Sequence, residues 1–234
     1  MKALILAAGL GTRLKPVTNH IPKALVESEG KTLLQHTIEH LKNNGIRQII
    51  INVHHFPDQI IDFLNKHRNF GVEIAISDES DRLLDTGGGL KNAEWFFAGH
   101  DPLVVRNVDI ISDLDLRTME SFHKHSHALA TLAVRIRETS RYLIFDEDNL
   151  LCGWRNLLTR QVLLPRTSGK RLQDYAFSGI QILNPELLSK ITEKGKFTLI
   201  DLYLRLCAEE RILGYLEMNS KWRDAGKKEF TDDF

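Results

Sequence analysis

The strongest chemical signal in the sequence is a glycine-rich loop that follows a short apolar run. Residues 7–14 read AAGLGTRL, and Lys23 follows after Pro22. Small residues let the backbone approach a ligand closely, and their N–H groups can line an anion site. A guanidinium suits phosphate oxygens, and an ammonium is a compact charge that neutralises a phosphoryl group. We therefore expect phosphate binding by Ala7, Ala8, Gly9, Gly11, Thr12, Arg13 and Lys23.

Neither of the two common glycine signatures explains this loop. A P-loop needs Gly-x4-Gly-Lys-Ser/Thr, which the loop lacks, and a dinucleotide fingerprint needs a third glycine where Leu14 stands. An ordinary tight loop is the alternative. The cations and prolines that follow the glycines favour a binding role.

Two carboxylates, far apart in the sequence, are candidates for a metal site. Asp109 comes just after a predicted buried strand, and Asp224 lies in a late Trp-Arg-Asp-Ala-Gly segment. The carboxyl ends of strands in an open α/β sheet face the ligand crevice. Mg²⁺ takes one or two carboxylates together with substrate phosphates. Asp109 could instead be a strand-end cap, with Asp113 and Asp115 as nearby rivals, and Asp224 a solvated turn residue.

A second glycine cluster, Gly87 to Gly89, follows Thr86. Backbone without side chains can lie flat against a planar base or a ribose. Glu79, a few residues earlier, could accept a hydrogen bond from a base edge. The alternatives are a closely packed helix N-terminus for the glycines and a solvated loop position for Glu79. The expected nucleotide contacts here are Glu79, Thr86, Gly87 and Gly88.

Strands and helices alternate regularly in the first half of the chain. Four apolar strands are predicted at 2–7, 47–53, 72–77 and 102–106, with helices at 32–43, 57–67 and 86–97. This order predicts an α/β fold with a Rossmann-like, doubly wound and mostly parallel sheet. The second half is mixed, with strands at 129–135, 142–145, 160–164, 176–183 and 212–216, a short piece near Trp222, and helices at 185–192 and 198–209. We expect one domain over 1–234, in which residues 1–125 bind the nucleotide and residues 126–234 form the mixed part.

Composition excludes several classes of protein. The 234 residues carry 31 Lys and Arg against 31 Asp and Glu, so we expect neither a nucleic-acid binder nor a membrane-surface protein. No apolar run approaches the roughly 18 residues of a membrane span. Two cysteines are too few for a disulfide scaffold or a thiolate zinc site, so a cytoplasmic setting is expected. His123, His125 and His127 do not converge on a helix, and no metal site is expected there.

Residues 7–25, AAGLGTRLKPVTNHIPKAL, resemble the signature of the sugar-phosphate nucleotidyltransferases. This family joins a nucleoside triphosphate to a sugar 1-phosphate and releases pyrophosphate. The resemblance implies the nucleotide-diphospho-sugar transferase fold, with the mixed C-terminal part binding the sugar phosphate. It also implies a Mg²⁺ ion on Asp109 and Asp224, and catalytic roles for Arg13, Lys23 and Asp109.

The sugar side carries a second resemblance and two departures. Residues 174–185 resemble the family's sugar-pocket strand, which implies substrate contacts from Asn107, Tyr175, Ser178, Gly179 and Trp222. Val108 stands where the family usually has glycine, and a β-branched residue resists a positive φ. The Glu-Lys-Pro triplet of longer members, whose lysine meets the sugar phosphate, is missing. Lys170 and Arg171 are candidate substitutes, with a solvated loop position as the alternative.

The short chain and its Leu-Asp-Thr-Gly-Gly-Gly segment are most similar to the N-acetylmuramate 1-phosphate uridylyltransferases and the mannose-1-phosphate guanylyltransferases. The expected reaction is an in-line attack on the α-phosphate, with UTP and N-acetylmuramate 1-phosphate or GTP and mannose 1-phosphate. Such a product would serve nucleotide-sugar and cell-wall synthesis. The alternatives are a non-catalytic nucleotide-sugar sensor and a cytidylyltransferase for a non-sugar phosphate such as phosphocholine. We expect a monomer or homodimer, and no hexapeptide β-helix domain.

Overall fold

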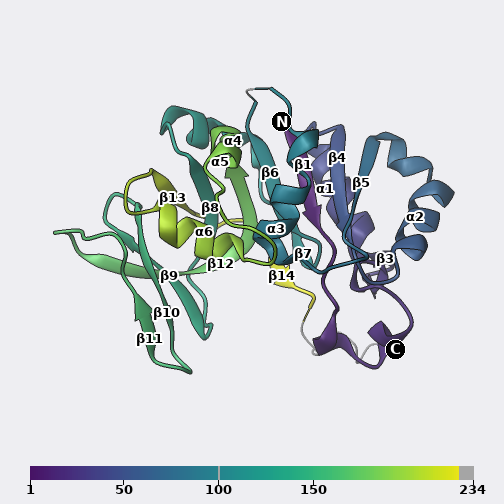
Figure 1. The fold of residues 1–234 in the computed structure, drawn as a ribbon, viewed down its shortest axis with the longest axis horizontal. Coiled ribbons are helices and arrows are strands. Elements are labelled where there is room, and N and C mark those ends of the chain that lie inside the picture. The colour runs from purple at the N-terminus through teal and green to yellow at the C-terminus, as the bar shows by residue number, and fades with distance from the viewer. Residues whose placement is uncertain (100, 227–234) are drawn as a thin grey trace.

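A parallel sheet forms the centre of the N-terminal half. The computed structural model describes residues 1–99 and 101–226 (Figure 1). Adjacent parallel strands run in the order β6-β1-β4-β5, which is the order of a doubly wound sheet. Their bounds are β1 Lys2–Leu6, β4 Gln48–Val53, β5 Glu73–Asp78 and β6 Leu103–Asn107. The predicted fold class is thereby confirmed.

Helices cover both faces of this sheet and divide the core in two. One core packs apolar residues of α1, α2 and α4 against Ile5 and Ile49, and the other packs α3, α5 and α6 against Leu4 and Ile50. Alternate residues of a strand point to opposite faces, so the central residues of β1 and β4 are apolar on both faces and serve both cores. The helices are α1 Leu33–Asn43, α2 Pro57–Lys66, α3 Asp85–Asn92, α4 Leu116–His125, α5 Glu186–Ser189 and α6 Leu199–Leu206.

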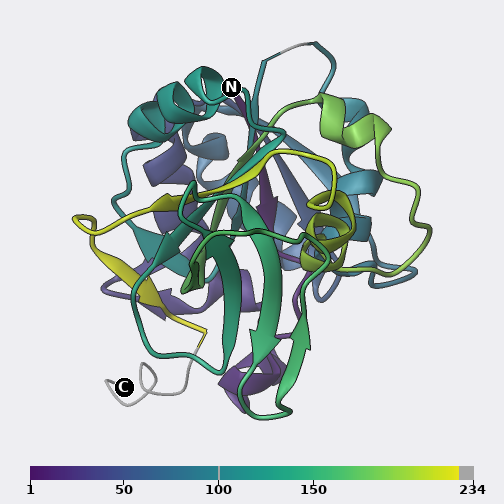
Figure 2. The same ribbon diagram turned by 90° about the vertical axis from the view of Figure 1, so that its left-hand side faces the viewer.

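The C-terminal half extends the same sheet with mostly antiparallel strands. β12 pairs with β6 near its carboxyl end and with β9 near its start, and β10 and β11 continue outward from β9. β8 pairs with the bulged middle and end of β12, and β13 lies parallel to β8. These strands project to one side in Figure 1 and face the viewer in Figure 2. Their bounds are β8 Ala130–Arg135, β9 Arg141–Asp146, β10 Leu151–Asn156, β11 Gln161–Leu163, β12 Leu172–Leu183 and β13 Ile212–Leu216.

Several short elements differ from the sequence prediction. β10 and β7 were not predicted, because Gly153 interrupts the apolar pattern of β10 and β7 has only three residues. The predicted helix 86–97 ends at Asn92 and is followed by a separate 3-10 turn. β12 begins four residues earlier than predicted. Its first residues, which include polar side chains, pair with β9 and lack the apolar pattern by which the rest of the strand was predicted. The remaining strands are β2 Glu27–Ser28, β3 Lys31–Thr32, β7 Ile110–Ser112 and β14 Trp222–Asp224.

Helix length bears on membrane association. Within residues 1–99 and 101–226, no helix combines the length and the apolar character needed to cross a bilayer.

Candidate active site

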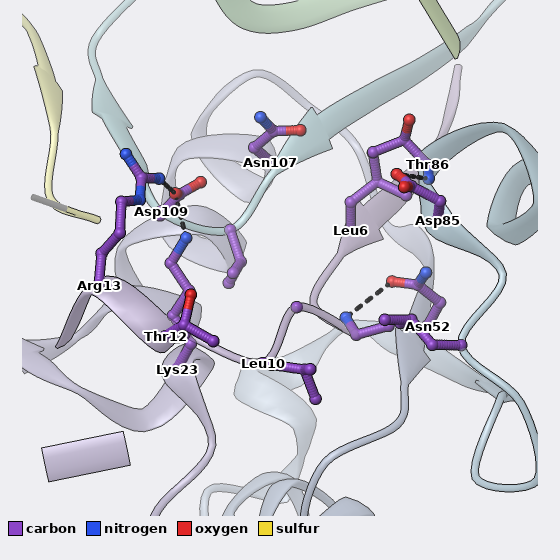
Figure 3. A pocket seen from close by; sticks show the side chains of 15 residues that line it. Leu6, Leu10, Thr12, Arg13, Lys23, Asn52, Asp85, Thr86, Asn107 and Asp109 are labelled. Carbon is purple, nitrogen blue, oxygen red and sulfur yellow. Dashed lines mark hydrogen bonds and ion pairs between the residues drawn. The ribbon is translucent and has the colours of Figure 1, made fainter. Parts of the chain in front are cut away.

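A cavity of about 420 Å³ opens at the carboxyl ends of β1 and β6, where open α/β sheets bind ligands (Figure 3). The glycine-rich loop forms one wall, and residues at the end of β6 and at the start of α3 form the others. The lining residues are Leu6, Ala8, Gly9, Leu10, Gly11, Thr12, Arg13, Lys23, Asn52, Leu83, Asp85, Thr86, Asn107, Val108 and Asp109. Most of the expected phosphate-binding loop therefore faces one cavity.

Cations and carboxylates gather at one end of the cavity. The Lys23 ammonium donates to the Asp109 carboxylate. Arg13 Nη2 lies 3.7 Å from Asp109 Oδ2, and Arg13 Nη1 lies 3.8 Å from Asp224 Oδ2. The Lys23 and Asp109 side chains are 13% and 10% exposed, whereas Arg13 is 57% exposed. Arg13 is thus free to move toward a ligand in the cavity, while Lys23 is held at its base.

Backbone pairing brings Asp224 to this place from the far end of the chain. β14 lies antiparallel to β7, with Asp224 opposite Ile110, and Ala225 N donates to Asp109 O at 2.9 Å. The two predicted metal ligands are therefore fixed side by side by hydrogen bonds between their own strands. Asp113, a rival in the sequence, instead accepts from Lys221 N, and Asp115 caps α4 by accepting from Arg117 N and Thr118 N.

The bare face of Gly226 shows how closely the charged groups converge. A Cβ at this position would lie 2.5 Å from Asp109 Oδ2, 2.9 Å from Lys23 Nζ and 3.0 Å from Asp224 Oδ1. Asp109 Oδ2 and Asp224 Oδ1 both lie within 3.0 Å of this one point, so the two carboxylates are close neighbours. Two carboxylates this close, beside a cavity wide enough for phosphates, are the donor set that Mg²⁺ takes. Among the described residues there is no cluster of three or more acidic, histidine or cysteine ligands.

The glycine-rich loop is held by an asparagine that the sequence analysis did not select. Asn52 Oδ1 accepts from Ala7 N at 2.7 Å and from Ala8 N at 3.3 Å. These two N–H groups are thus occupied, which corrects the expectation that they line the anion site. In residues 1–99 and 101–226, the N–H groups of Gly9, Leu10 and Gly11 have no hydrogen-bond partner. The signal for Asn52 was its position near the carboxyl end of a strand adjacent to β1.

Glu79 supports Asn52 from behind. Glu79 Oε1 accepts from Asn52 Nδ2 at 2.7 Å, and Oε2 accepts from Leu84 N at 3.1 Å. Burial raises the pKa of the Glu79 carboxyl, while these two hydrogen bonds and nearby His54 lower it. Glu79 is only 3% exposed, so the solvated-loop alternative is wrong. Both carboxylate oxygens are engaged inside the protein, so the geometry gives Glu79 the role of holding the loop.

The triple glycine is required by packing. A Cβ on Gly87 would collide with Phe197, one on Gly88 with Gly195 O, and one on Gly89 with Asn52 at 2.6 Å and Glu79 at 2.8 Å. The N–H groups of Gly87 and Gly88 both donate to Phe197 O. The structure therefore supports the closely packed helix start, and Gly87 and Gly88 do not line the cavity. Thr86 does line it, and Thr86 Oγ1 accepts from Leu199 N at 2.9 Å.

The predicted sugar-side residues have different surroundings. Asn107 lines the cavity, and Gly179 packs beside it with φ +77° and no room for a Cβ. Trp222 Nε1 donates to Ser178 O at 2.9 Å, and the Ser178 side chain is fully buried. Tyr175 is 8% exposed in the second core. Its hydroxyl donates to Gln173 at 2.6 Å. Tyr175 is not among the residues that line the 420 Å³ cavity, and its sugar contact stays a prediction.

Val108 causes no strain before Asp109. Its φ is not positive, its N–H donates to Leu6 O at 3.2 Å, and its carbonyl accepts from Thr37 Oγ1 at 3.3 Å. The side chain is 3% exposed in the first core. The departure from glycine is therefore accommodated by packing.

A buried arginine lies beneath the carboxylates. Arg106, in β6, is 1% exposed and donates to Ile110 O and to His40 Nδ1, each at 2.5 Å. Burial lowers the pKa of Arg106 to about 10, although nearby Asp109 raises it. Burial and the Arg106 charge together lower the pKa of His40 to about 4, so His40 is neutral at pH 7. This pair was not predicted from the sequence, since an arginine in an apolar strand has no partner within its own segment.

Known proteins with similar sequences and folds agree with this geometry. Residues 2–230 match the family model described as nucleotidyl transferase. Mannose-1-phosphate guanyltransferase 2 of Candida glabrata is 33% identical over 231 residues, covering 97% of this chain and 62% of its own length. The chain thus spans less than two thirds of that relative.

Solved structures share the fold. HddC from Yersinia pseudotuberculosis, complexed with GMP-PN, superposes with a TM-score of 0.78 at 24% identity over 99% of this chain and 96% of its own. UDP-glucose pyrophosphorylase complexed with UDP-glucose gives 0.77 at 20% identity, over 97% and 94%. With the family model matching nearly the whole chain, this protein belongs to the nucleotidyl transferase family.

Proposed function

We propose that this chain joins a nucleoside triphosphate to a sugar 1-phosphate, giving a nucleoside diphosphate sugar and pyrophosphate. An oxygen of the sugar phosphate forms a bond to the α-phosphorus. The bond from that phosphorus to the oxygen bridging to the β-phosphate breaks, and pyrophosphate leaves with the electron pair. The observation that carries this proposal is the convergence of Lys23, Arg13, Asp109 and Asp224 at one end of the loop cavity.

Charge and alignment are the main tasks of such a site. The attacking phosphate is already anionic, so the reaction needs no general base. The protein must align two anions and offset their repulsion. Lys23, held at the base of the cavity, would contact the transferred or sugar phosphate, and the exposed Arg13 with the open amides of Gly9 to Gly11 would contact the leaving pyrophosphate.

Asp109 and Asp224 would hold the divalent cation, because their oxygens converge beside Gly226. When bound, Mg²⁺ neutralises phosphate charge and orients the phosphates. The backbone bond from Ala225 N to Asp109 O holds the two segments side by side, and the Arg13 guanidinium lies near both carboxylates. Their role therefore depends on the β14–β7 pairing as much as on their own chemistry.

The opposite end of the cavity supports a guanine base. Asp85 and Thr86 lie there, across the cavity from Arg13 and Asp109 (Figure 3). The guanine edge presents two neighbouring N–H donors, which one carboxylate can accept together, whereas uracil presents a single donor. The Candida glabrata relative also carries a guanyltransferase name. GTP with mannose 1-phosphate is therefore the favoured pair, and UTP with N-acetylmuramate 1-phosphate is the second.

A pyrophosphate-release assay tests the proposal. ATP, CTP, GTP and UTP are each combined with mannose 1-phosphate, glucose 1-phosphate, N-acetylmuramate 1-phosphate and phosphocholine, with and without Mg²⁺. We expect release with GTP and a sugar 1-phosphate, dependent on Mg²⁺. Nucleotide-sugar binding without release from any pair would support a non-catalytic sensor. Release only with CTP and phosphocholine would support the cytidylyltransferase alternative.

The base assignment has its own test. Asp85→Asn replaces one acceptor oxygen with a donor and is expected to raise the KM for GTP by roughly 10-fold or more relative to UTP. Asp85 has φ +64°, a conformation that asparagine tolerates well, so the loop is kept. An unchanged ratio of kcat/KM between the two triphosphates would contradict guanine recognition by Asp85.

A further inference from the structure

A half-buried arginine stacks on Trp222, which shares strand β14 with Asp224, and it forms no ion pair with a carboxylate in residues 1–99 or 101–226. Arg137 follows β8, and its guanidinium carbon lies 4.5 Å from the centroid of the Trp222 ring. Arg137 Nη2 donates to Phe177 O at 3.1 Å, and Nη1 donates to Glu138 O at 3.3 Å. The guanidinium is therefore fixed in position by an aromatic face and two carbonyls.

The charge of Arg137 is not neutralised within the described part of the chain. No ion pair joins it to a described carboxylate, and its Nε is buried with no hydrogen-bond partner among those residues. Burial lowers the pKa of Arg137, while nearby Asp224 raises it. Arg135, the last residue of β8, pairs instead with Glu217 at 2.8 Å. Burying a cation without an ion pair is costly, so a held guanidinium that has no ion-pair partner among the described residues, next to the proposed site of phosphate transfer, indicates an anionic ligand.

A second cavity, of about 230 Å³, begins at Arg137. Aromatic and apolar side chains form most of its wall, including Tyr142, Trp154, Phe177 and Ile200. Aromatic rings pack well against the apolar face of a sugar ring. Because Arg137 touches both this cavity and the Trp222 ring of β14, it stands between the carboxylate end of the first cavity and an aromatic pocket.

We propose that Arg137 binds the phosphate of the sugar 1-phosphate and that the cavity beside it holds the sugar ring. This inference rests on the proposed function. Arg137, which follows β8, would then take the place of the lysine that the Glu-Lys-Pro triplet supplies in longer members of the family. The substitutes considered from the sequence lie elsewhere: Lys170 pairs with Asp148, and Arg171 is exposed; neither lines a described cavity.

The test compares two variants that each remove one positive charge. Arg137→Gln keeps a donor for Phe177 O but loses the charge, and Lys170→Gln is the matched control. With GTP and mannose 1-phosphate, or the best pair from the panel, Arg137→Gln should raise the KM for the sugar 1-phosphate roughly 10- to 100-fold. The KM for the triphosphate should stay within about twofold. Arg137→Lys should recover part of the loss, because charge returns without the planar fork. Lys170→Gln should match the wild type.

Binding measured without turnover separates this inference from the proposed function. Mannose 1-phosphate should raise the melting temperature of the wild type and not that of Arg137→Gln. If the wild type releases no pyrophosphate with any pair, the proposed function fails. If the wild type is active and Arg137→Gln leaves the sugar-phosphate KM unchanged, or raises both KM values equally, the inference fails. Should Arg137→Gln not fold, an unchanged sugar-phosphate KM in Arg137→Lys overturns it.

Discussion

Replacing Asn52 with Asp tests whether an internal polar pair holds the glycine-rich loop. The change keeps the shape of the side chain and the Oδ1 acceptor for Ala7 N and Ala8 N. It converts the donor that faces Glu79 Oε1 at 2.7 Å into a second oxygen. Both side chains are almost fully buried, so two ionised carboxylates cannot remain there. The folded variant must hold one proton between them.

The pH dependence follows from that proton. A free carboxyl has a pKa of about 4, and each pH unit above it costs about 1.4 kcal/mol to protonate. The variant should therefore lose about 4 kcal/mol of unfolding free energy at pH 7 and about 1.4 kcal/mol at pH 5, relative to wild type at the same pH. The sign is fixed because the folded state binds more protons than the unfolded state in this window, so stability falls as pH rises.

Urea unfolding at both pH values measures this, with Gln48→Glu as control. Gln48 of β4 and Glu73 of β5 form the same kind of amide–carboxylate pair as Asn52 and Glu79, but in an exposed position, where a change of charge costs little. We expect a loss below about 1 kcal/mol for the control at either pH. An Asn52→Asp variant with equal losses at pH 5 and pH 7, or with a loss as small as the control's, would refute the role of this pair.

Two further substitutions address the charged end of the cavity. Lys23→Ala should lower turnover at saturating substrates by about 100-fold or more, as for other lost electrostatic stabilisers, and full turnover would exclude the role given to Lys23. Gly226→Ala places a methyl group 2.5 Å from Asp109 Oδ2 and 3.0 Å from Asp224 Oδ1. It should reduce kcat at least 10-fold, since ångström-scale displacements at a reacting centre are costly. Gly169→Ala, with no atom within 4 Å, should match wild type in the same assay, and equal kcat values for both alanine variants would contradict the crowding argument.

Local patterns predicted the parallel half of the fold well. The strands of that half are largely apolar and helices α1 and α2 have one apolar face, so each is visible within a short window of sequence. Helix α4 was not predicted, because polar and charged residues separate its few apolar positions. The structure also brings together the loop cations and both carboxylates that the sequence singled out, each of which belongs to a motif or follows a strand. Residues that act through distant partners were not found. The role of Asn52 follows from its hydrogen bonds to Ala7 and Glu79, and that of Arg106 from its hydrogen bond to His40.

The glycines show why a motif alone is ambiguous. Gly9 faces open space, whereas Gly87 to Gly89 are bare because Phe197, Gly195, Asn52 and Glu79 already occupy the positions of their side chains. The sequence cannot distinguish a glycine that leaves space for a ligand from one whose missing side chain leaves space for other residues of the same chain. Only the neighbours of each position, which come from other parts of the chain, decide between the two.

One frame links the loop, the carboxylates and the last strand. Asn52 fixes the start of the loop, Val108 N donates to Leu6 O, and Ala225 N donates to Asp109 O. The first two bonds tie β4 and the segment after β6 to the end of β1, and the third ties the end of β14 to that segment, so the groups proposed to bind phosphates share one base. Arg137 and the aromatic cavity belong to the other half of the sheet. If the cavity beside Arg137 holds the sugar ring as proposed, we expect residues of this second half to decide which sugar is accepted, with the charged groups of the first half unchanged.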